Sequence, residues 1–154
     1  MGLFDGINIS ASGLTAQRLR MDVIANNIAN AQSTRSVDNP NEPYRRQRVI
    51  FSPVEGSGSF ASVLGNKLQS PGLGVAVTAV EKDMETPFKL VYDPSHPDAV
   101  KDPNDPGYGY VRMPNVDVTA EMVDMIAASR GYEANVTAVN AAKAMALKAL
   151  EIGR

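Results

Sequence analysis

The chain has 154 residues, 44% of them hydrophobic, and 15 basic against 17 acidic side chains give it a formal net charge of -2. This length suits one domain of ordinary size, and the charge lacks the basic excess of a nucleic-acid-binding protein or a polybasic membrane anchor. The absence of cysteine excludes disulfides and cysteine metal sites, and the single histidine excludes a histidine-rich one. We therefore expect no cofactor, no metal, no nucleic-acid partner and no direct insertion into a membrane.

Proline placement divides the chain. All 10 prolines lie between Pro40 and Pro114, and because proline costs about 3 kcal/mol inside a helix, the two proline-free ends are predicted to be helical. In the first end, from about residue 3 to 31, apolar residues recur every seven positions with an interleaved second set, the pattern of a coiled-coil seam. The first set is Ile7, Leu14, Met21 and Ile28, and the second set includes Leu3, Ile24 and Ala31.

The middle of the chain is predicted to form short strands and loops. Arg46 to Phe51 and Gly74 to Lys82 are candidate strands. We expect Pro87 to Tyr92 to return beside the second of these as a hairpin, with the turn near residues 83–86. Residues 93–107 hold four prolines and are predicted to be a loop.

The last segment has the strongest helical pattern. Asp117 or Thr119 is placed to cap its N-terminus. Apolar side chains form two rows along it, and a helix that is apolar on two faces needs more than one partner. The predicted fold is mainly α with a small β part: an N-terminal helix in residues 1–34, a proline-rich middle in 35–114, and a C-terminal helix in 115–154. The two helices are expected to pair as a coiled coil.

His96 is the one candidate for catalysis, and it would support the hypothesis that the chain is a small hydrolase. It lies in a proline-rich loop with Asp93 and Ser95 nearby, but a catalytic triad needs partners held rigidly in space. A solvated loop histidine is the simpler interpretation. The neighbouring Asp/Pro/Gly-rich stretch fails as a calcium loop, because Pro106 and Met113 stand where oxygen ligands are required.

Two further patterns have simple explanations. The run from Gly56 to Ala61 fits a loose dinucleotide-binding fingerprint, but no helix of a βαβ unit follows it before Pro71, so a loop tip is expected. Arg45, Arg46 and Arg48 follow Tyr44. In an acidic chain such arginines favour a charged strand edge or a contact with a neighbouring subunit. The sequence thus favours an assembly module without enzymatic activity.

The two ends also carry recognisable motifs. Residues 10–17 (SASGLTAQ) with 23–30 (VIANNIAN), and residues 129–135 (SRGYEAN), resemble the N- and C-terminal signatures of flagellar rod and hook proteins. Two further stretches, residues 89–98 (KLVYDPSHPD) and 109–118 (GYVRMPNVDV), narrow the resemblance to the proximal rod proteins of that family. Residues 53–86 carry no motif of the family.

The resemblance implies a structural subunit of the basal-body rod, exported unfolded and without a cleaved signal peptide through the flagellar type III apparatus. Its partners would be other rod proteins and copies of itself, in a torque-transmitting shaft that crosses the periplasm. The terminal helices would form an inner coiled coil and the middle a small outer part. A free-standing coiled-coil adaptor or an export chaperone is the alternative.

The expected assembly interface lies on the two helices. It comprises Ile7, Leu14, Met21, Ile24, Asn27, Ile28, Asn30, Met122, Met125, Tyr132, Asn135, Val136, Val139 and Leu150. Asparagine is a mediocre helix former, so Asn27, Asn30 and Asn135 are hypothesised to hydrogen-bond across helices and fix their register, as a polar seam residue does.

Overall fold

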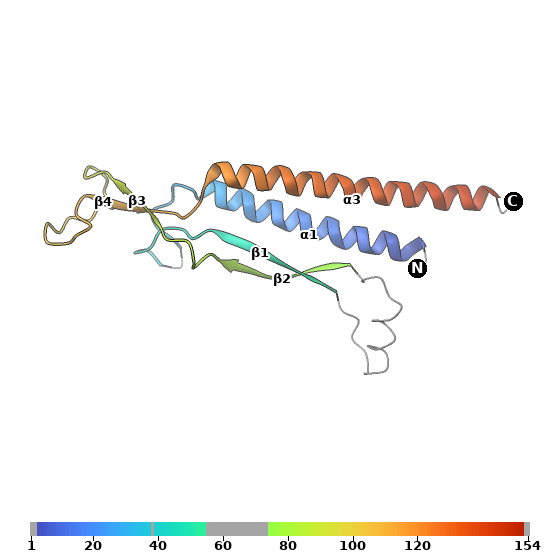
Figure 1. The fold of residues 1–154 in the computed structure, drawn as a ribbon, viewed down its shortest axis with the longest axis horizontal. Helices are drawn as coiled ribbons and strands as arrows, with labels where there is room; N and C mark the ends of the chain where they lie inside the picture. The colour runs from blue at the N-terminus through green and yellow to red at the C-terminus, as the bar shows by residue number, and fades with distance from the viewer. Residues whose placement is uncertain (1–2, 38, 55–73, 153–154) are drawn as a thin grey trace, which may run out of the picture. The chain divides into compact units, whose positions relative to one another are not determined.

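The computed structural model describes residues 3–37, 39–54 and 74–152. Along these residues the order is α1 (Leu3–Ala29), β1 (Gln47–Pro53), β2 (Val75–Lys82), β3 (Lys89–Tyr92), β4 (Tyr110–Met113) and α3 (Val118–Ile152) (Figure 1). The helices hold 27 and 35 residues, and each of the strands has 8 or fewer. The fold is therefore mainly helical with a small β part, as the sequence predicts. No helix in the described ranges is long and apolar enough to cross a membrane.

The ends of the helices follow from local chemistry. The Asp117 carboxylate accepts a hydrogen bond from the backbone N–H of Thr119 (3.0 Å), so Asp117 caps α3. At the other helix, the N–H of Ala31 bonds the carbonyl of Ile28 (3.2 Å). This tighter turn ends α1 at Ala29, two residues before the predicted end.

The strands form two separate two-stranded sheets. One contains β1 and β2, and the other contains β3 and β4. In the second sheet the strands are antiparallel, with Lys89 opposite Met113 and Tyr92 opposite Tyr110. The predicted hairpin between Gly74–Lys82 and Pro87–Tyr92 is therefore wrong, because each of these segments pairs with a strand more distant in sequence.

The cause of that difference lies at Asp83. The Asp83 N–H still bonds the Arg46 carbonyl (2.8 Å), in line with β2. The chain then turns, because the Asp83 carboxylate accepts hydrogen bonds from the N–H groups of Glu85 and Thr86 (both 3.1 Å). Pro87 follows and has no N–H to donate to a returning strand. The side-chain amide of Asn115 donates to the carbonyls of Asp83 and Thr86 and so stabilises this turn.

The chain forms two compact units, each built from segments distant in sequence. The first unit comprises Met1–Met21, Val49–Val80 and Ile126–Arg154, and the second comprises Asp22–Arg48 and Glu81–Met125. In the first unit α1 and α3 lie side by side and antiparallel (Figure 1), and Ala16 and Ala128 are buried. Buried apolar residues of the second unit are Val23, Ile24, Ala99, Val111 and Val116.

Candidate functional site

A cluster of hydrogen-bonded polar side chains lies inside the second unit, where the end of α1, the start of β1, the turn after β2 and the start of α3 meet. We call it the polar junction. Its members are Asn27, Tyr44, Arg46, Gln47, Asp83, Asn115 and Glu121. Four of them, Asn27, Asp83, Asn115 and Glu121, are buried. Burying polar groups costs free energy unless each finds a partner, so the bonding pattern of this cluster decides whether the unit is stable.

Asn27 uses the full bonding capacity of its amide. Its Nδ2 donates to the carbonyl of Gln47 (2.9 Å) and to Oε2 of Glu121 (3.0 Å). Its Oδ1 accepts from the Gln47 N–H (2.9 Å) and from the Tyr44 hydroxyl (2.9 Å). With two donors and two acceptor sites all occupied, one side chain joins α1 to β1, to the preceding loop and to α3.

Glu121 is the more deeply buried of the two acids of the junction, with 1% of its surface exposed. Its Oε1 lies 2.5 Å from Nε of Arg46, while Nη2 of Arg46 lies 3.3 Å from Asp124. A buried charge is tolerated only when it is paired and hydrogen-bonded, and Glu121 has both an arginine and an amide. Burial is the main cause that raises the pKa of the Tyr44 hydroxyl above its ordinary 10.0, and the nearby negative charge of Glu121 raises this pKa further.

Asn115 closes the other side of the junction. Its Oδ1 accepts the Arg46 N–H (2.8 Å), and its Nδ2 donates to the carbonyls of Asp83 (3.1 Å) and Thr86 (3.2 Å). Hydrogen bonds from the backbone and side chain of Thr86 favour the charged carboxylate of Asp83, so they lower its pKa. Asn115 thus connects the residue before β1 to the turn that follows β2.

A second polar contact in the same unit fastens the loop before β4. Thr34 Oγ1 donates to Oδ2 of Asp98 (2.8 Å), and Arg35 donates to Oδ1 through Nε (3.0 Å) and Nη2 (2.5 Å). The hydrogen bond from Arg35 is the main cause that lowers the pKa of the Asp98 carboxyl, and the bond from Thr34 lowers this pKa further. His96 belongs to the same loop, where its Nδ1 accepts the Asp98 N–H (3.1 Å). That bond makes His96 a local turn contact.

In the first unit the two helices approach closely at glycines. A Cβ placed on Gly13 would meet the Asn135 side chain at 2.9 Å, and one on Gly131 would meet Gln17 at 3.3 Å. Asn135 itself donates to the Gly131 carbonyl of its own helix (2.9 Å). Gly13, although glycine is a poor helix former, therefore makes room for a side chain of α3.

The same unit also anchors β2 to α1. Ser12 Oγ accepts the N–H of Val75 (3.1 Å) and donates to the Ile9 carbonyl (2.6 Å). Gly74, just before the strand, has φ of +111°, and a Cβ there would collide with Ser12 Oγ. Glycine is needed for both reasons.

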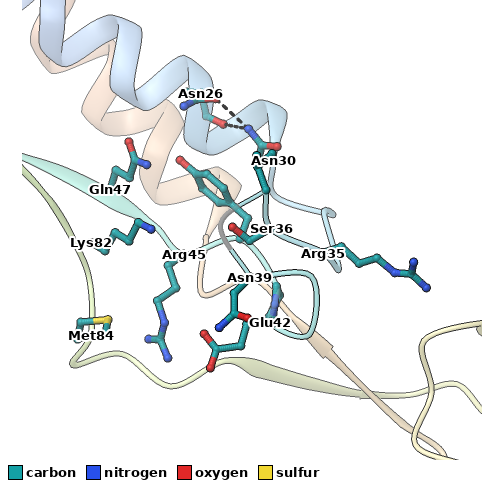
Figure 2. A pocket seen from close by; sticks show the side chains of 13 residues that line it. Asn26, Asn30, Arg35, Ser36, Asn39, Glu42, Arg45, Gln47, Lys82 and Met84 are labelled. Atoms are coloured by element: carbon teal, nitrogen blue, oxygen red, sulfur yellow. Dashed lines mark hydrogen bonds between the residues drawn. The ribbon is translucent and has the colours of Figure 1, made fainter.

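A pocket of about 430 Å³ in the second unit is lined by the end of α1, the loop that follows it, Gln47 and the end of β2. Figure 2 shows Asn26 and Asn30 at its helical side, with Asn30 Nδ2 donating to Oδ1 of Asn26 (2.8 Å). Its lining also includes Arg35, Arg45, Lys82 and Glu42, but the guanidinium of Arg35 points away from the pocket and binds Asp98 (Figure 2). Because histidine is absent from its lining residues, the pocket offers no pairing of a hydroxyl nucleophile with an imidazole base.

The predicted interface residues differ in exposure. Ile24 and Asn27 are buried, while Met122 and Leu150 are 57% and 72% exposed. The other members are partly exposed: Ile7, Leu14, Met21, Ile28, Asn30, Met125, Tyr132, Asn135, Val136 and Val139. Of the three asparagines, Asn27 bonds across to α3, whereas Asn30 bonds Asn26 near the end of α1 and Asn135 bonds the Gly131 carbonyl of its own helix. The glycine-containing run from Gly56 to Ala61 lies outside the described residues.

Sequence reasoning missed most of the polar junction. It placed Arg46 on a charged strand edge or against a neighbouring subunit, but the Arg46 side chain turns inward to Glu121. Nothing in the sequence alone pairs Glu121 or Asn115 with Arg46, although both contact it. A usable clue was that Arg46 is the first residue of the predicted strand, where alternation points one side chain in two toward the core.

Comparisons with known proteins agree with this architecture. Residues 7–35 match the family model "Flagella basal body rod protein", and residues 109–152 match "Flagellar basal body rod FlgEFG protein C-terminal". The helical ends therefore carry the features of flagellar axial proteins. Three relatives are each called "Flagellar basal-body rod protein FlgC". That of Borreliella burgdorferi is 50% identical over 99% of this chain and 98% of its own length. Those of Bacillus subtilis and Salmonella typhimurium are 46% and 41% identical, with both chains fully covered.

These similarities define the class as structural proteins of the flagellar rod. Within that class, the chain belongs to the FlgC family of basal-body rod proteins. It is a structural subunit of the rod, and its relatives do not favour the alternative of a coiled-coil adaptor or export chaperone.

Proposed function

We propose that the chain enters the proximal rod through α1 and α3, which form an inner coiled-coil part, while residues 35–114 form an outer part. One observation carries this proposal: α3 keeps large apolar side chains exposed after α1 has packed on it. In the first unit these include Ile126 (56%), Met145 (60%) and Leu150 (72%). In the second unit they include Met122 (57%) and Val123 (63%). Large apolar side chains that stay exposed on a helix after its own partner has packed are suited to burial against further partners.

The geometry of the first unit explains why α1 alone leaves this surface uncovered. Close approach at Gly13 and Gly131 brings the helix backbones together, and Ala128 at the contact is fully buried. A closely packed helix covers only the stripe of α3 that faces it. The remaining apolar rows are therefore available to neighbouring subunits.

The full proposal follows the family. Partners are other rod proteins and copies of this chain, delivered by the flagellar type III export apparatus without a cleaved signal peptide. The rod crosses the periplasm and transmits torque, and the chain does no catalysis. The interface residues predicted on α1 and α3 are proposed contacts within the chain and between subunits, with Ile24 and Asn27 acting within the chain.

The test separates folding from assembly. Met145→Asp and Leu150→Asp place charges on side chains that are already exposed, so the purified variants should keep the wild-type helical circular dichroism. In cells they should fail to enter the rod, because a charge would be buried at a subunit contact without a partner. Val136→Asp and Ile28→Asp should also prevent incorporation.

Thr137→Asp is the matched control, since Thr137 is exposed and polar on the same helix, and its carriers should swim. Basal bodies of normal composition from Met145→Asp or Leu150→Asp cells would contradict the proposed interface. Ser57→Asp, in the segment expected to be a loop tip, should also leave cells motile.

A further inference from the structure

The β3–β4 sheet of the second unit is largely exposed along β3. Because the register sets Val91 opposite Val111, these two share a face, on which Val111 is 1% and Val91 is 44% exposed. Leu90 lies opposite Arg112 and Tyr92 opposite Tyr110, so these four project from the other face. We call them the platform. Leu90 and Tyr92 are 64% and 62% exposed.

The platform is held in one arrangement despite its exposure. The rings of Tyr92 and Tyr110 meet edge to face, with centroids 5.2 Å apart and planes at 65°. Tyr92 also lies over Gly109, whose φ is +78° and whose added Cβ would meet the ring at 2.7 Å. A glycine in a left-handed conformation is therefore required for the ring to sit there. Aromatic side chains fixed before binding lose little entropy when a partner covers them.

The composition of the platform resembles that of a binding hot spot. Tyrosine and arginine are enriched at such positions. An aromatic surface with one arginine is suited to a partner that offers apolar rings and negative charge.

The chain itself carries such a partner segment in the loop before β4. Residues 102–106 read Asp-Pro-Asn-Asp-Pro, and all five are exposed. The Asp102 carboxylate accepts the Asn104 N–H (3.0 Å), and the Asp105 carboxylate accepts the Gly107 N–H (2.8 Å). These turns, with Asp98 held by Thr34 and Arg35, limit the freedom of the loop. Proline rings dock on aromatic surfaces, and aspartate complements Arg112.

We propose that the platform of one copy receives the 102–106 loop of a second copy, with proline on Tyr92 and Tyr110 and aspartate on Arg112. The two patches differ, so the contact is heterologous, and repeated heterologous contacts generate rings or helical arrays. This inference rests on the proposed assembly into the rod, to which it adds a contact outside the terminal helices.

Cysteine cross-linking tests the contact directly, because the native chain has no cysteine. Cells would produce two tagged copies of different size, one with Leu90→Cys and one with Asn104→Cys. A disulfide requires the two Cα atoms to come within about 7 Å. Mild oxidation should therefore yield the mixed dimer only when both substitutions are present. Pairing Asn104→Cys with Thr137→Cys, on the exposed side of α3, should yield none.

Variants of the platform then test its chemistry. Tyr92→Ala in the Leu90→Cys copy should lower the dimer yield about tenfold, as loss of a hot-spot residue does, while Tyr92→Phe should keep it. Arg112→Asp should abolish the dimer, and Asp105→Arg on the other copy should restore it. Circular dichroism of each purified variant checks that the fold remains.

The outcomes separate this contact from rod assembly itself. Motile cells whose rods contain both copies but give no mixed dimer would overturn the contact and leave the assembly proposal intact. A dimer that persists with Tyr92→Ala and Arg112→Asp would also overturn it, as would a cross-link from the platform to a different polypeptide. Isolated rods that lack the chain altogether would overturn both proposals.

Discussion

The side-chain amide of Asn27 pairs with the backbone of Gln47 as a neighbouring β-strand would. It donates to the Gln47 carbonyl and accepts from the Gln47 N–H, both at 2.9 Å. A helix residue thus satisfies the edge of β1 at its first position, where an unpaired buried backbone group would cost free energy. The relationship fixes where the strand begins relative to the end of α1.

Replacing Asn27 by alanine should therefore be among the most destabilising changes in the second unit. Asn27→Ala leaves Gln47, Tyr44 and Glu121 without their amide partner, and we expect a loss of roughly 2–4 kcal/mol of unfolding free energy from these buried unsatisfied groups. Asn30→Ala is the control, because Asn30 bonds only Asn26 and Ser33 nearby, and it should stay within about 0.5 kcal/mol. Urea unfolding followed by circular dichroism measures both. Equal losses would refute the role assigned to Asn27.

Glycine-to-alanine changes in α1 should separate helix propensity from close packing. The Cβ added by Gly6→Ala would lie in open space, whereas the Cβ added by Gly13→Ala would contact the Asn135 side chain. Both substitutions should stabilise the helix by about 1 kcal/mol through intrinsic helix propensity. We expect Gly6→Ala to raise the thermal stability of the helices and Gly13→Ala to gain less or lose. Adding Asn135→Ala to Gly13→Ala should recover part of the difference. Indistinguishable melting curves for the two single variants would show that the close approach at Gly13 does not matter.

Asp98 should contribute to the acid sensitivity of the second unit. Hydrogen bonds from Arg35 and Thr34 lower its folded-state pKa below the ordinary 3.8. The stability it supplies is therefore complete above that value and is lost as pH falls from there through the folded pKa. Asp98→Asn should unfold more easily at neutral pH and show a shallower loss of stability on acidification, as measured by urea unfolding at a series of pH values. An acid limb as steep as in the wild type would count against this role.

His96→Ala should leave motility and rod assembly nearly unchanged. The substitution removes one hydrogen bond, between His96 Nδ1 and the Asp98 N–H, in a partly exposed loop that Thr34 and Arg35 also hold. Swimming in soft agar and the composition of isolated basal bodies measure the effect. Immotile cells with normally assembled rods would point instead to a catalytic or ligand-binding role for this histidine.

Folding of the helical ends should be coupled to assembly. The sequence predicts fast amide exchange over about residues 1–30 and 125–154 in a purified monomer, because isolated helices are marginal in water. Because Asn27 and Glu121 are buried, residues 22–29 and 118–125 should exchange slowly together with the polar junction, so fast exchange in α1 should be confined to residues before about 22. Hydrogen exchange by mass spectrometry on a verified monomer resolves this. Slow exchange along both helices to their outer ends would show that they fold without neighbours.

The sequence by itself determined the elements that depend on local chemistry. Absence of proline located both helices, supported by heptad spacing in the first and two apolar rows in the second, and Asp117 was already a candidate for the cap it forms. The terminal motifs determined the family, because they lie on the two helices and can be recognised without knowing how the middle of the chain folds.

Only the tertiary structure decided how the middle pairs and which polar residues are buried. Pro87–Tyr92 was expected beside the strand that precedes it, yet β3 pairs with β4, because Asp83 and Asn115 stabilise a turn away from β2. Arg46 and Glu121 are 75 residues apart. Periodicity describes one segment at a time and carries no information on which distant charge will meet another. Burial then selects among the possible pairings, since a carboxylate removed from water is tolerated only beside its partners.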